Sequence, residues 1–288
     1  MKVALIVVPY DSGRFMARWG LGPIAIRRAG LAEALTAAGH NVTEATVLLG
    51  DPDPREVTTG FAVAAEIARL CQAALAGGRF PLVIAGNCLS AVGVCAGIGA
   101  DAAVWFDAHG DLNTPETSGS GLLDGMALAT VLGACWPKLA GAVPGFAPIH
   151  AGRVVLAGAR DLDPPEAALI AARGIAHVPA GEAATAARAA TQGAARAYVH
   201  LDLDVLDPAM LSVNRYAVPG GASLEALGAA VHDVAHAAPV TGAAITAYDP
   251  AVDPDGRTAT AAVSLATALV AAVADRWTWD AVSAAVKL

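Results

Sequence analysis

Charged side chains are scarce in this chain of 288 residues, and their scarcity limits what the protein can be. Asp, Glu, Lys and Arg together make up 15% of the residues, whereas hydrophobic residues make up 56%. A chain of this composition can bury a large core, which excludes an intrinsically disordered protein. No run of Lys and Arg occurs, and the formal net charge is −8. We therefore expect no nucleic-acid partner.

A membrane span and a paired-cysteine motif are also missing. The apolar runs fall short of the ~20 residues that a membrane helix needs, so we expect no membrane partner. The N-terminal MKVALIVVPY has no small-residue cleavage site after it and is typical of a first β-strand. The four cysteines, Cys71, Cys88, Cys95 and Cys135, form no CxxC pair. Reduced thiols in a cytoplasmic protein are the simplest expectation.

Short apolar runs alternate along the chain with longer Ala-rich stretches. The apolar runs are continuously hydrophobic, as strands are when both faces of their sheet are covered. The alternation predicts βαβ units, and therefore an α/β fold with a parallel sheet. We expect strands at residues 2–8, 41–49, 81–86, 102–108, 153–159, 197–204 and 240–248. We expect helices near residues 24–38, 59–77, 90–99, 124–134, 165–172, 181–195, 223–237 and 257–275.

The sequence contains no linker, repeat or charge run that would divide it. We therefore expect one domain over residues 1–288, with the Pro/Gly-rich residues 136–151 as a surface excursion. The chain ends in RWTWDAVSAAVKL soon after the last expected helix, which favours a monomer.

Acidic side chains gather where two of the expected strands end. In VWFDAHGDLN, the side chains of Asp107, His109 and Asp111 share one face of an extended segment, because side chains alternate with period two. In VHLDLDVLDP, Asp202 and Asp204 have the same spacing. Ligands of open α/β sheets bind at this edge of the sheet. Packing such carboxylates together without a counter-charge would cost several kcal/mol per group.

Divalent metal ions would remove that repulsion. Four aspartates and one imidazole form an oxygen-rich ligand set with room for two ions, which suits Mn²⁺ better than Zn²⁺. Two metals that share carboxylates can hold a hydroxide between them as a nucleophile near neutral pH. Helix capping or turn formation is the alternative; it fits Asp207 before Pro208, but it fits the paired acids poorly.

Both acidic motifs resemble those of a known family. DAHGD and HLDLDVLDP are similar to the D-A-H-x-D and D-x-D-x-x-D-P signatures of the ureohydrolases, the arginase/agmatinase family. LGPIAIRRAGL, GARDLDP and PGGASLEAL are similar too, so the resemblance covers most of the chain. It implies a three-layer α/β/α sandwich around a mainly parallel sheet, and an enzyme that hydrolyses a guanidino group.

The resemblance also implies how two Mn²⁺ ions are shared among the ligands. Asp107 and Asp202 would bridge the two ions. Asp111 would complete the first metal site, while His109 and Asp204 would complete the second.

One expected ligand departs from the family. The first metal of ureohydrolases also binds a histidine from a GGDHS-type turn, and the matching AGNCLS places Cys88 at that position. With a thiolate in place of a neutral imidazole, four aspartates and one cysteine would carry five negative charges. The two Mn²⁺ ions carry only four positive charges. The first metal should then be a weaker Lewis acid, whose bound water ionises at higher pH. An inert buried thiol is the alternative.

The loop DLNTPETSGSGLLDGM resembles that of arginases with the same spacing. Asn113, Ser118 and Ser120 match residues that bind an α-carboxylate, directly or through water. Asp163 in GARDLDPPE matches the carboxylate that binds the α-amino group. Together they favour an arginine-like amino acid as the small-molecule substrate over agmatine, which lacks the carboxylate. Ordinary loop polarity is the alternative for each residue.

Two further positions differ from the family. Asp124 replaces a histidine proposed as a proton shuttle, and helix capping is its alternative role. Asp124 needs burial or like-charged neighbours to serve as an acid, since an unperturbed aspartate ionises well below neutrality. The family's E-x-N-P segment, whose glutamate holds the guanidinium, matches AITAYDP and places Ala247 at that glutamate. Asp249 lies two residues further on.

These departures predict the substrate. A site without the glutamate should hold a permanently charged guanidinium poorly. An N-hydroxyguanidine is less basic and can enter neutral, so we expect cleavage of Nω-hydroxy-L-arginine to hydroxyurea and L-ornithine, with Asp124 and His109 as catalytic residues. The departures resemble those of the family branch that serves D-cycloserine biosynthesis, an antibiotic pathway. An arginase or another guanidino-acid amidinohydrolase is the alternative, and a non-catalytic metal- or amino-acid-binding relative is a further one.

Overall fold

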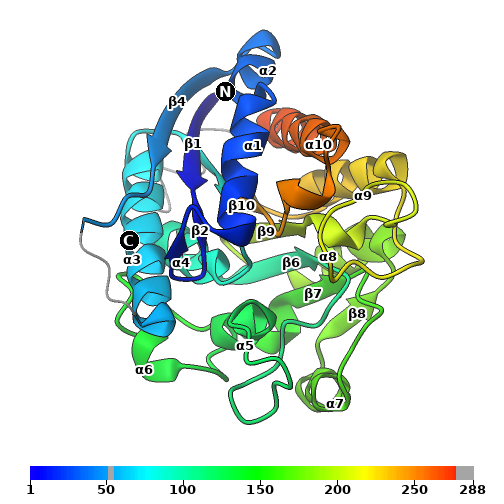
Figure 1. Ribbon diagram of the computed structural model, residues 1–288. Coiled ribbons are helices and arrows are strands. Elements are labelled where there is room, and N and C mark those ends of the chain that lie inside the picture. The colour runs from blue at the N-terminus through cyan, green and yellow to red at the C-terminus, as the bar shows by residue number, and fades with distance from the viewer. Residues whose placement is uncertain (51–54, 277–288) are drawn as a thin grey trace.

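A parallel sheet of eight strands runs through the middle of the molecule (Figure 1). This computed structural model describes residues 1–50 and 55–276, and its strand order is β4-β1-β5-β10-β9-β6-β7-β8. The strands of this sheet are β1 (Lys2–Val8), β4 (Asn41–Thr46), β5 (Phe80–Ala85), β6 (Ala102–Phe106), β7 (Val154–Ala157), β8 (Ala176–Val178), β9 (Ala197–Asp202) and β10 (Val240–Thr246). A separate antiparallel hairpin consists of β2 (Tyr10–Asp11) and β3 (Arg14–Phe15).

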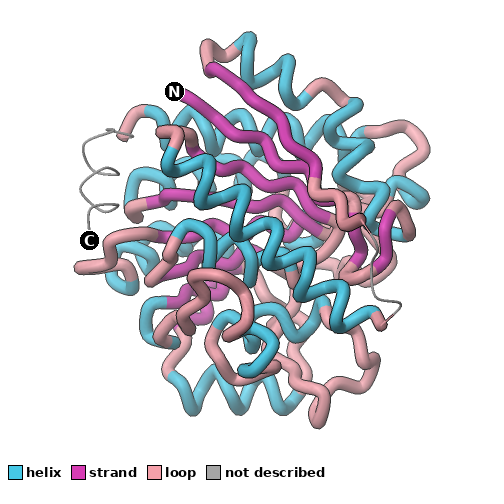
Figure 2. Tube along the Cα trace, turned by 90° about the vertical axis from the view of Figure 1, so that its left-hand side faces the viewer, coloured by secondary structure: helices cyan, strands magenta, loops and turns pink. Residues whose placement is uncertain are grey.

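Helices cover both faces of the sheet, as the two views in Figures 1 and 2 show. One layer comprises α1 (Gly22–Arg28), α2 (Leu31–Ala37), α8 (Ala183–Ala190), α9 (Leu224–Ala237) and α10 (Arg257–Ala274). The opposite layer comprises α3 (Glu56–Ala76), α4 (Ser90–Ile98), α5 (Ala127–Val131), α6 (Pro137–Ala140) and α7 (Pro164–Arg173). The predicted three-layer α/β/α fold is confirmed.

Strand β1 shows why these strands read as unbroken apolar runs. Its residues Val3, Leu5 and Val7 pack into the core beneath α1 and α10, whereas Ile6 and Val8 pack into the core beneath α3 and α4. Alternate side chains of a strand point to opposite faces, and here each face meets a helix layer.

The expected strands lie close to the observed ones, and the differences fall at the edges. The sequence prediction missed β8, a three-residue edge strand that contains His177, and it missed the short hairpin. The helix expected at residues 24–38 is interrupted at Gly30, which has a left-handed φ of 93°. Residues 136–151, predicted as a surface excursion, are mostly exposed or half-buried, and Val143 and Ile149 anchor the stretch in the core. The terminal residues 277–288, on which the monomer expectation depends, lie outside the described residues.

The path of the chain creates one crowded edge of the sheet. After β1, β4 and β5 the chain skips the centre and forms β6, β7 and β8, and it then returns with β9 and β10 to fill the gap. The carboxyl ends of β5, β10, β9 and β6 therefore lie side by side in the middle of the sheet. Open parallel sheets bind ligands at such a point.

Among residues 1–50 and 55–276, two helices are long and apolar enough to span a membrane. They are α3 and α10, and 56% of the most apolar window of each is buried inside the protein. Core helices meet the same criterion, and both helices pack their apolar residues against the sheet.

Helices α3 and α4 pack closely because α4 presents glycine to its neighbour. A Cβ atom added at Gly93 would lie 2.3 Å from the carbonyl oxygen of Ala64, and one added at Gly97 would lie 2.5 Å from the Cβ of Cys71. Helix α4 begins two residues after Cys88. The close contact therefore fixes the turn that carries this thiol.

Because of this close contact, the same Gly→Ala substitution should have opposite effects on the free energy of unfolding at two helical positions. Gly93→Ala should lower the free energy of unfolding by about 1–3 kcal/mol, because backbone must move to admit the methyl group. Gly228→Ala in α9 is the matched control; its Cβ would meet only Leu265 Cδ2 at 3.9 Å. This change should raise the free energy of unfolding by about 0.5–1 kcal/mol. Urea unfolding of both variants measures the two effects, and equal shifts would contradict the packing argument.

Candidate active site

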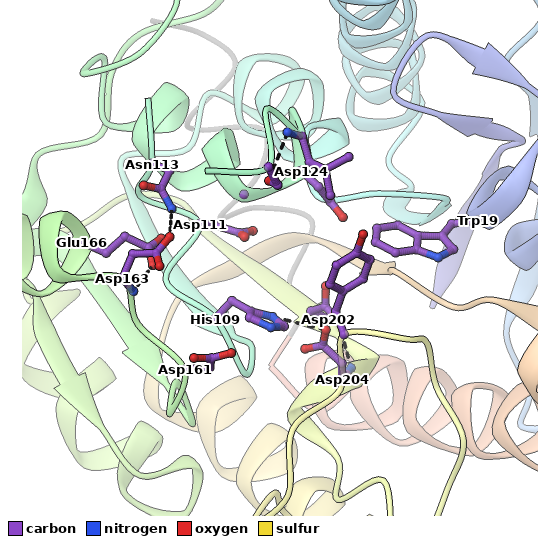
Figure 3. Close-up of a pocket in the computed structure, with 14 residues that line it drawn as sticks. Trp19, His109, Asp111, Asn113, Asp124, Asp161, Asp163, Glu166, Asp202 and Asp204 are labelled. Carbon is purple, nitrogen blue, oxygen red and sulfur yellow. Dashed lines mark hydrogen bonds and ion pairs between the residues drawn. The ribbon is translucent and has the colours of Figure 1, made fainter. Parts of the chain in front are cut away.

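Three loops at the central edge of the sheet carry the expected metal ligands, and Figure 3 labels four of these residues, His109, Asp111, Asp202 and Asp204. Cys88 lies in the turn between β5 and α4, and residues 107–111 follow β6. Asp202 is the last residue of β9, and Asp204 lies in the 3₁₀ turn that follows it. The segment that begins with Ala247 follows β10.

His109 lies between two carboxylates. Its Nδ1 is 3.4 Å from Asp107 Oδ1 and 3.4 Å from Asp204 Oδ2. Burial lowers the pKa of His109, but the hydrogen bonds and charges of the two carboxylates outweigh it and raise the pKa to about 12. The position therefore attracts positive charge strongly, as a metal site must.

A second group of ligand atoms adjoins the first. Atoms of Cys88, Asp107, Asp111 and His200 lie within 4.8 Å of one another. The Cys88 Sγ is 3.0 Å from Asp202 Oδ2. Asp107 belongs to both groups, so the two groups share one carboxylate.

The acids converge in a way that the sequence did not predict. Strand β6 ends at Phe106, so Asp107, His109 and Asp111 lie in a loop rather than on one face of an extended strand. The His109 N–H donates to Asp107 Oδ1 at 2.7 Å, and Asp111 has a left-handed φ of 53°. A non-glycine residue with such a φ is strained, and strain of this kind gathers at functional sites.

The donor set fits divalent cations. Burial, followed by neighbouring carboxylates, raises the pKa values of Asp107, Asp111 and Asp202. The Oδ2 atom of Asp111 is buried and has no hydrogen-bond partner within the described residues. Burial, with nearby carboxylates, also raises the pKa of the Cys88 thiol. Cations bound here would stabilise the ionised forms and occupy the unpaired oxygen.

Asp124 contacts the same turn. Its Oδ1 accepts a hydrogen bond from the Cys88 N–H at 2.5 Å, and it caps no helix. Burial, with the charges of Asp11 and Asp107, raises the pKa of Asp124 to about 8. The carboxyl group can therefore hold a proton near neutral pH.

A cavity of about 230 Å³ opens beside these residues. Three of the expected substrate-binding residues, Asn113, Ser120 and Asp163, line it. The Asn113 Nδ2 donates to Asp163 Oδ2 at 2.9 Å, which joins two of the predicted residues. Ser118 does not line the cavity; its Oγ accepts from the Gly121 N–H at 2.9 Å and lies 3.4 Å from Ser120 Oγ.

The cavity also contains residues that sequence reasoning missed. They are Trp19, Asp161, Glu166 and Tyr216. The Glu166 carboxylate accepts the N–H groups of Leu112 and Asp163, both at 2.9 Å, and so holds the two substrate loops together. No sequence pattern links Trp19 to Tyr216, whose rings meet edge to face at 5.6 Å.

His200 was missed as well, although a signal for it existed. It stands two residues before Asp202, so it shares that strand face. Its ring is fully buried and stacks on Trp105 with centroids 3.7 Å apart. Burial lowers the pKa of His200 to about 3.

The residue that matches the family's glutamate, Ala247, does not itself line the cavity of about 230 Å³. Ala247 is buried with a left-handed φ of 62°, and its carbonyl oxygen accepts from Asn214 Nδ2 at 2.9 Å. Asp249 lines an adjoining cavity of about 350 Å³ together with Asp11. Asp124 lines both cavities.

Comparison with known proteins decides the family. The Arginase family model matches residues 1–271. The chain belongs to the arginase family. An arginase of Bacillus caldovelox is 31% identical over 287 residues, which are 91% of this chain and 96% of that protein. The crystal structure of arginase from Bacillus cereus superposes with a TM-score of 0.85 at 31% identity and covers 93% of this chain and 98% of its own.

A third relative carries a more specific name. The N(omega)-hydroxy-L-arginine amidinohydrolase of Streptomyces lavendulae is 40% identical over 118 residues, which are 41% of each chain. The predicted ureohydrolase family and the prediction of an enzyme are confirmed. This arginase-family protein is a hydrolase that acts on guanidino groups.

Metal binding should depend on pH because the buried acids have raised pKa values. A carboxyl group whose pKa is raised by folding destabilises the metal-free fold once the pH exceeds its unfolded pKa, since the fold must then bury its charge. Bound Mn²⁺ removes that cost and displaces protons. The rise in Tm on adding Mn²⁺ should therefore grow between about pH 5 and about pH 8.

Calorimetry with and without Mn²⁺ measures this growth, and a pH-stat measures the protons released on loading. Asp111→Asn is the control variant, because it removes one titrating ligand and should release fewer protons. An identical Tm rise at both pH values would contradict the coupling.

Proposed function

We propose that this arginase-family protein hydrolyses Nω-hydroxy-L-arginine to hydroxyurea and L-ornithine. The observation that carries the proposal is Ala247, which stands where the family glutamate would hold a guanidinium cation. Asp249 does not replace the glutamate, because it lines the adjoining cavity. A neutral N-hydroxyguanidine needs no such carboxylate. The named relative from Streptomyces lavendulae supports this substrate over 41% of the chain.

The residues proposed to hold two Mn²⁺ ions are those of the two groups described above, without His200 and with Asp202 added. Asp107 belongs to both groups and Asp202 lies beside Cys88, so both would help to hold the ions. Cys88 and Asp111 would complete one site. His109 and Asp204 would complete the other. Bound there, the ions would supply Lewis acidity that activates water for attack on the guanidine carbon.

The polar wall of the cavity would hold the amino-acid end of the substrate. Asp163 would accept hydrogen bonds from the α-ammonium group, and Asn113, already bonded to it, would donate to the α-carboxylate. Ser120 lies on the same cavity wall. Ser118 would hold the substrate loop in place, because its Oγ accepts a hydrogen bond from the Gly121 N–H.

The leaving δ-amine of ornithine needs a proton when the C–N bond breaks. Asp124 lines the cavity and, with a pKa of about 8, carries that proton near neutrality. Its hydrogen bond to the Cys88 N–H fixes the carboxyl group beside the proposed metals. Asp124 is therefore proposed as the general acid.

L-Arginine is the second candidate substrate, because arginases are the relatives that match nearly the whole chain. Hydrolysis of arginine would require another group, such as a bound water, to replace the missing glutamate. The free energy of holding a full positive charge without the family's glutamate beside it opposes this assignment.

Steady-state kinetics should separate the two substrates. We expect kcat/KM for Nω-hydroxy-L-arginine to exceed that for L-arginine by at least about tenfold, since the site lacks the carboxylate that an arginine cation needs. Agmatine should react more slowly than either. Release of ornithine, urea and hydroxyurea measures the three rates, and faster turnover of plain arginine would defeat the assignment.

Replacement of Cys88, the proposed sulfur ligand, should change both the metal affinity and the pH dependence of kcat/KM. Cys88→His should alter the affinity for the first metal by about tenfold or more. The pH at which kcat/KM rises should fall, because a neutral imidazole leaves the metal a stronger Lewis acid. Cys95→Ala is the matched control, since Cys95 is a buried thiol inside α4. Unchanged metal affinity and pH profile in Cys88→His would make the thiol a bystander.

A further inference from the structure

Polar side chains lie one layer beneath the proposed metal ligands, inside the core between the sheet and α4. Tyr198 and His200 come from β9, Thr246 ends β10, and Trp105 comes from β6; none of the four is exposed. His200 pairs with Trp105 across the two strands. Polar groups in such a core are costly unless each finds a partner.

Three of these side chains form a continuous chain of hydrogen bonds that ends at Cys88. The Tyr198 hydroxyl is 2.8 Å from His200 Nδ1, and His200 Nε2 is 3.2 Å from Thr246 Oγ1. Thr246 Oγ1 is in turn 3.4 Å from Cys88 Sγ. The chain connects a phenol deep in the core to the sulfur at the site.

The protons that Tyr198, His200 and Thr246 carry determine which atom donates in each of these hydrogen bonds. Within the described residues the Tyr198 hydroxyl has no other hydrogen-bond partner, so its proton is donated to His200 Nδ1. A neutral imidazole that accepts at Nδ1 carries its single proton on Nε2 and donates it to Thr246 Oγ1. The hydroxyl proton of Thr246 is then left to point at Cys88 Sγ.

We propose that Tyr198, His200 and Thr246 form a positioning relay that aims the Thr246 hydroxyl at the sulfur of Cys88. This inference rests on the proposed role of Cys88 as a metal ligand. A hydrogen bond donated to a thiolate withdraws charge from the sulfur, so the metal receives less of the extra negative charge that cysteine brings. The relay therefore partly offsets the exchange of histidine for cysteine.

Asp107, another proposed metal ligand, also accepts a hydrogen bond from this buried layer. Trp105 Nε1 donates to Asp107 Oδ2 at 3.1 Å, and the Trp105 ring stacks on His200. The layer beneath the site thus offers a donor to the Asp107 carboxylate, which follows β6, and another to the Cys88 sulfur, which follows β5. The stacked ring also fixes the plane in which His200 Nε2 points.

The tautomer of His200 tests the relay without any turnover. In full-length protein with ¹⁵N-labelled histidine, NMR should show the Nε2–H form of His200, both metal-free and loaded with diamagnetic Zn²⁺. Tyr198→Phe should shift the ring towards the Nδ1–H form, because the phenol no longer supplies a proton. His200→Gln assigns the signals. An Nδ1–H parent would overturn the relay, and so would a Zn²⁺-loaded parent whose Nε2 carries no proton, since His200 would then be a ligand itself.

The hydrogen bond from the Thr246 hydroxyl to Cys88 Sγ is tested in the Co²⁺-loaded protein. The parent should show a sulfur-to-cobalt charge-transfer band that Cys88→Ala abolishes. Thr246→Val should move the band to lower energy, because the sulfur regains the charge that the hydrogen bond withdrew, whereas Thr246→Ser should retain the parent band. Thr130→Val is the matched control, since the equally buried Thr130 hydroxyl binds the Met126 carbonyl oxygen. A parent without the band, or an unchanged band in Thr246→Val, would overturn the relay.

The relay and the proposed function can fail separately. Loss of the tautomer and band signatures with intact hydroxyarginine turnover would overturn the relay alone. Preference for arginine with both signatures present would overturn the substrate and leave the relay supported.

Discussion

Buried negative charge at the carboxyl ends of β6 and β9 is the constraint on which the structure depends. Asp107 and Asp202 are nearly inaccessible to water, and their pKa values are raised first by this burial and then by neighbouring carboxylates. The chain path adds to the crowding, since β9 and β10 return into the gap between β5 and β6. An otherwise apolar protein tolerates such a cluster only with a counter-charge, so cation binding and the stability of this edge are linked.

The sequence predicted the fold and the identity of the clustered acids for separate reasons. Continuous apolar strands alternating with helices indicate a covered parallel sheet, and strand-end acids point to the edge where ligands bind. The geometry of the cluster was not predictable, because it depends on the left-handed backbone of Asp111 and on the 3₁₀ turn at Asp204. Trp19 and Tyr216 could not be found either, since they meet through tertiary packing of two unrelated loops.

The three departures from the family change where charge lies within the site. Cysteine at position 88 would add a negative ligand to the proposed metal cluster, whereas alanine at position 247 would remove a negative group from the proposed substrate side. Aspartate at position 124 would add another negative charge, but its pKa of about 8 keeps it protonated near neutrality. The exchanges together leave the substrate side less able to hold a cation and the metal side richer in electrons. Both changes suit a neutral, more electrophilic guanidine.

The buried polar layer explains why a histidine is tolerated in the middle of β9. Burial keeps His200 neutral, so it needs one donor and one acceptor, and Tyr198 and Thr246 provide them. Its flat ring fills the space beside Trp105. Removing any one partner would leave a buried polar atom unpaired, at a cost of about 1–3 kcal/mol. The three residues are therefore coupled to one another, and through the Thr246 hydroxyl their arrangement extends to the one sulfur among the proposed ligands.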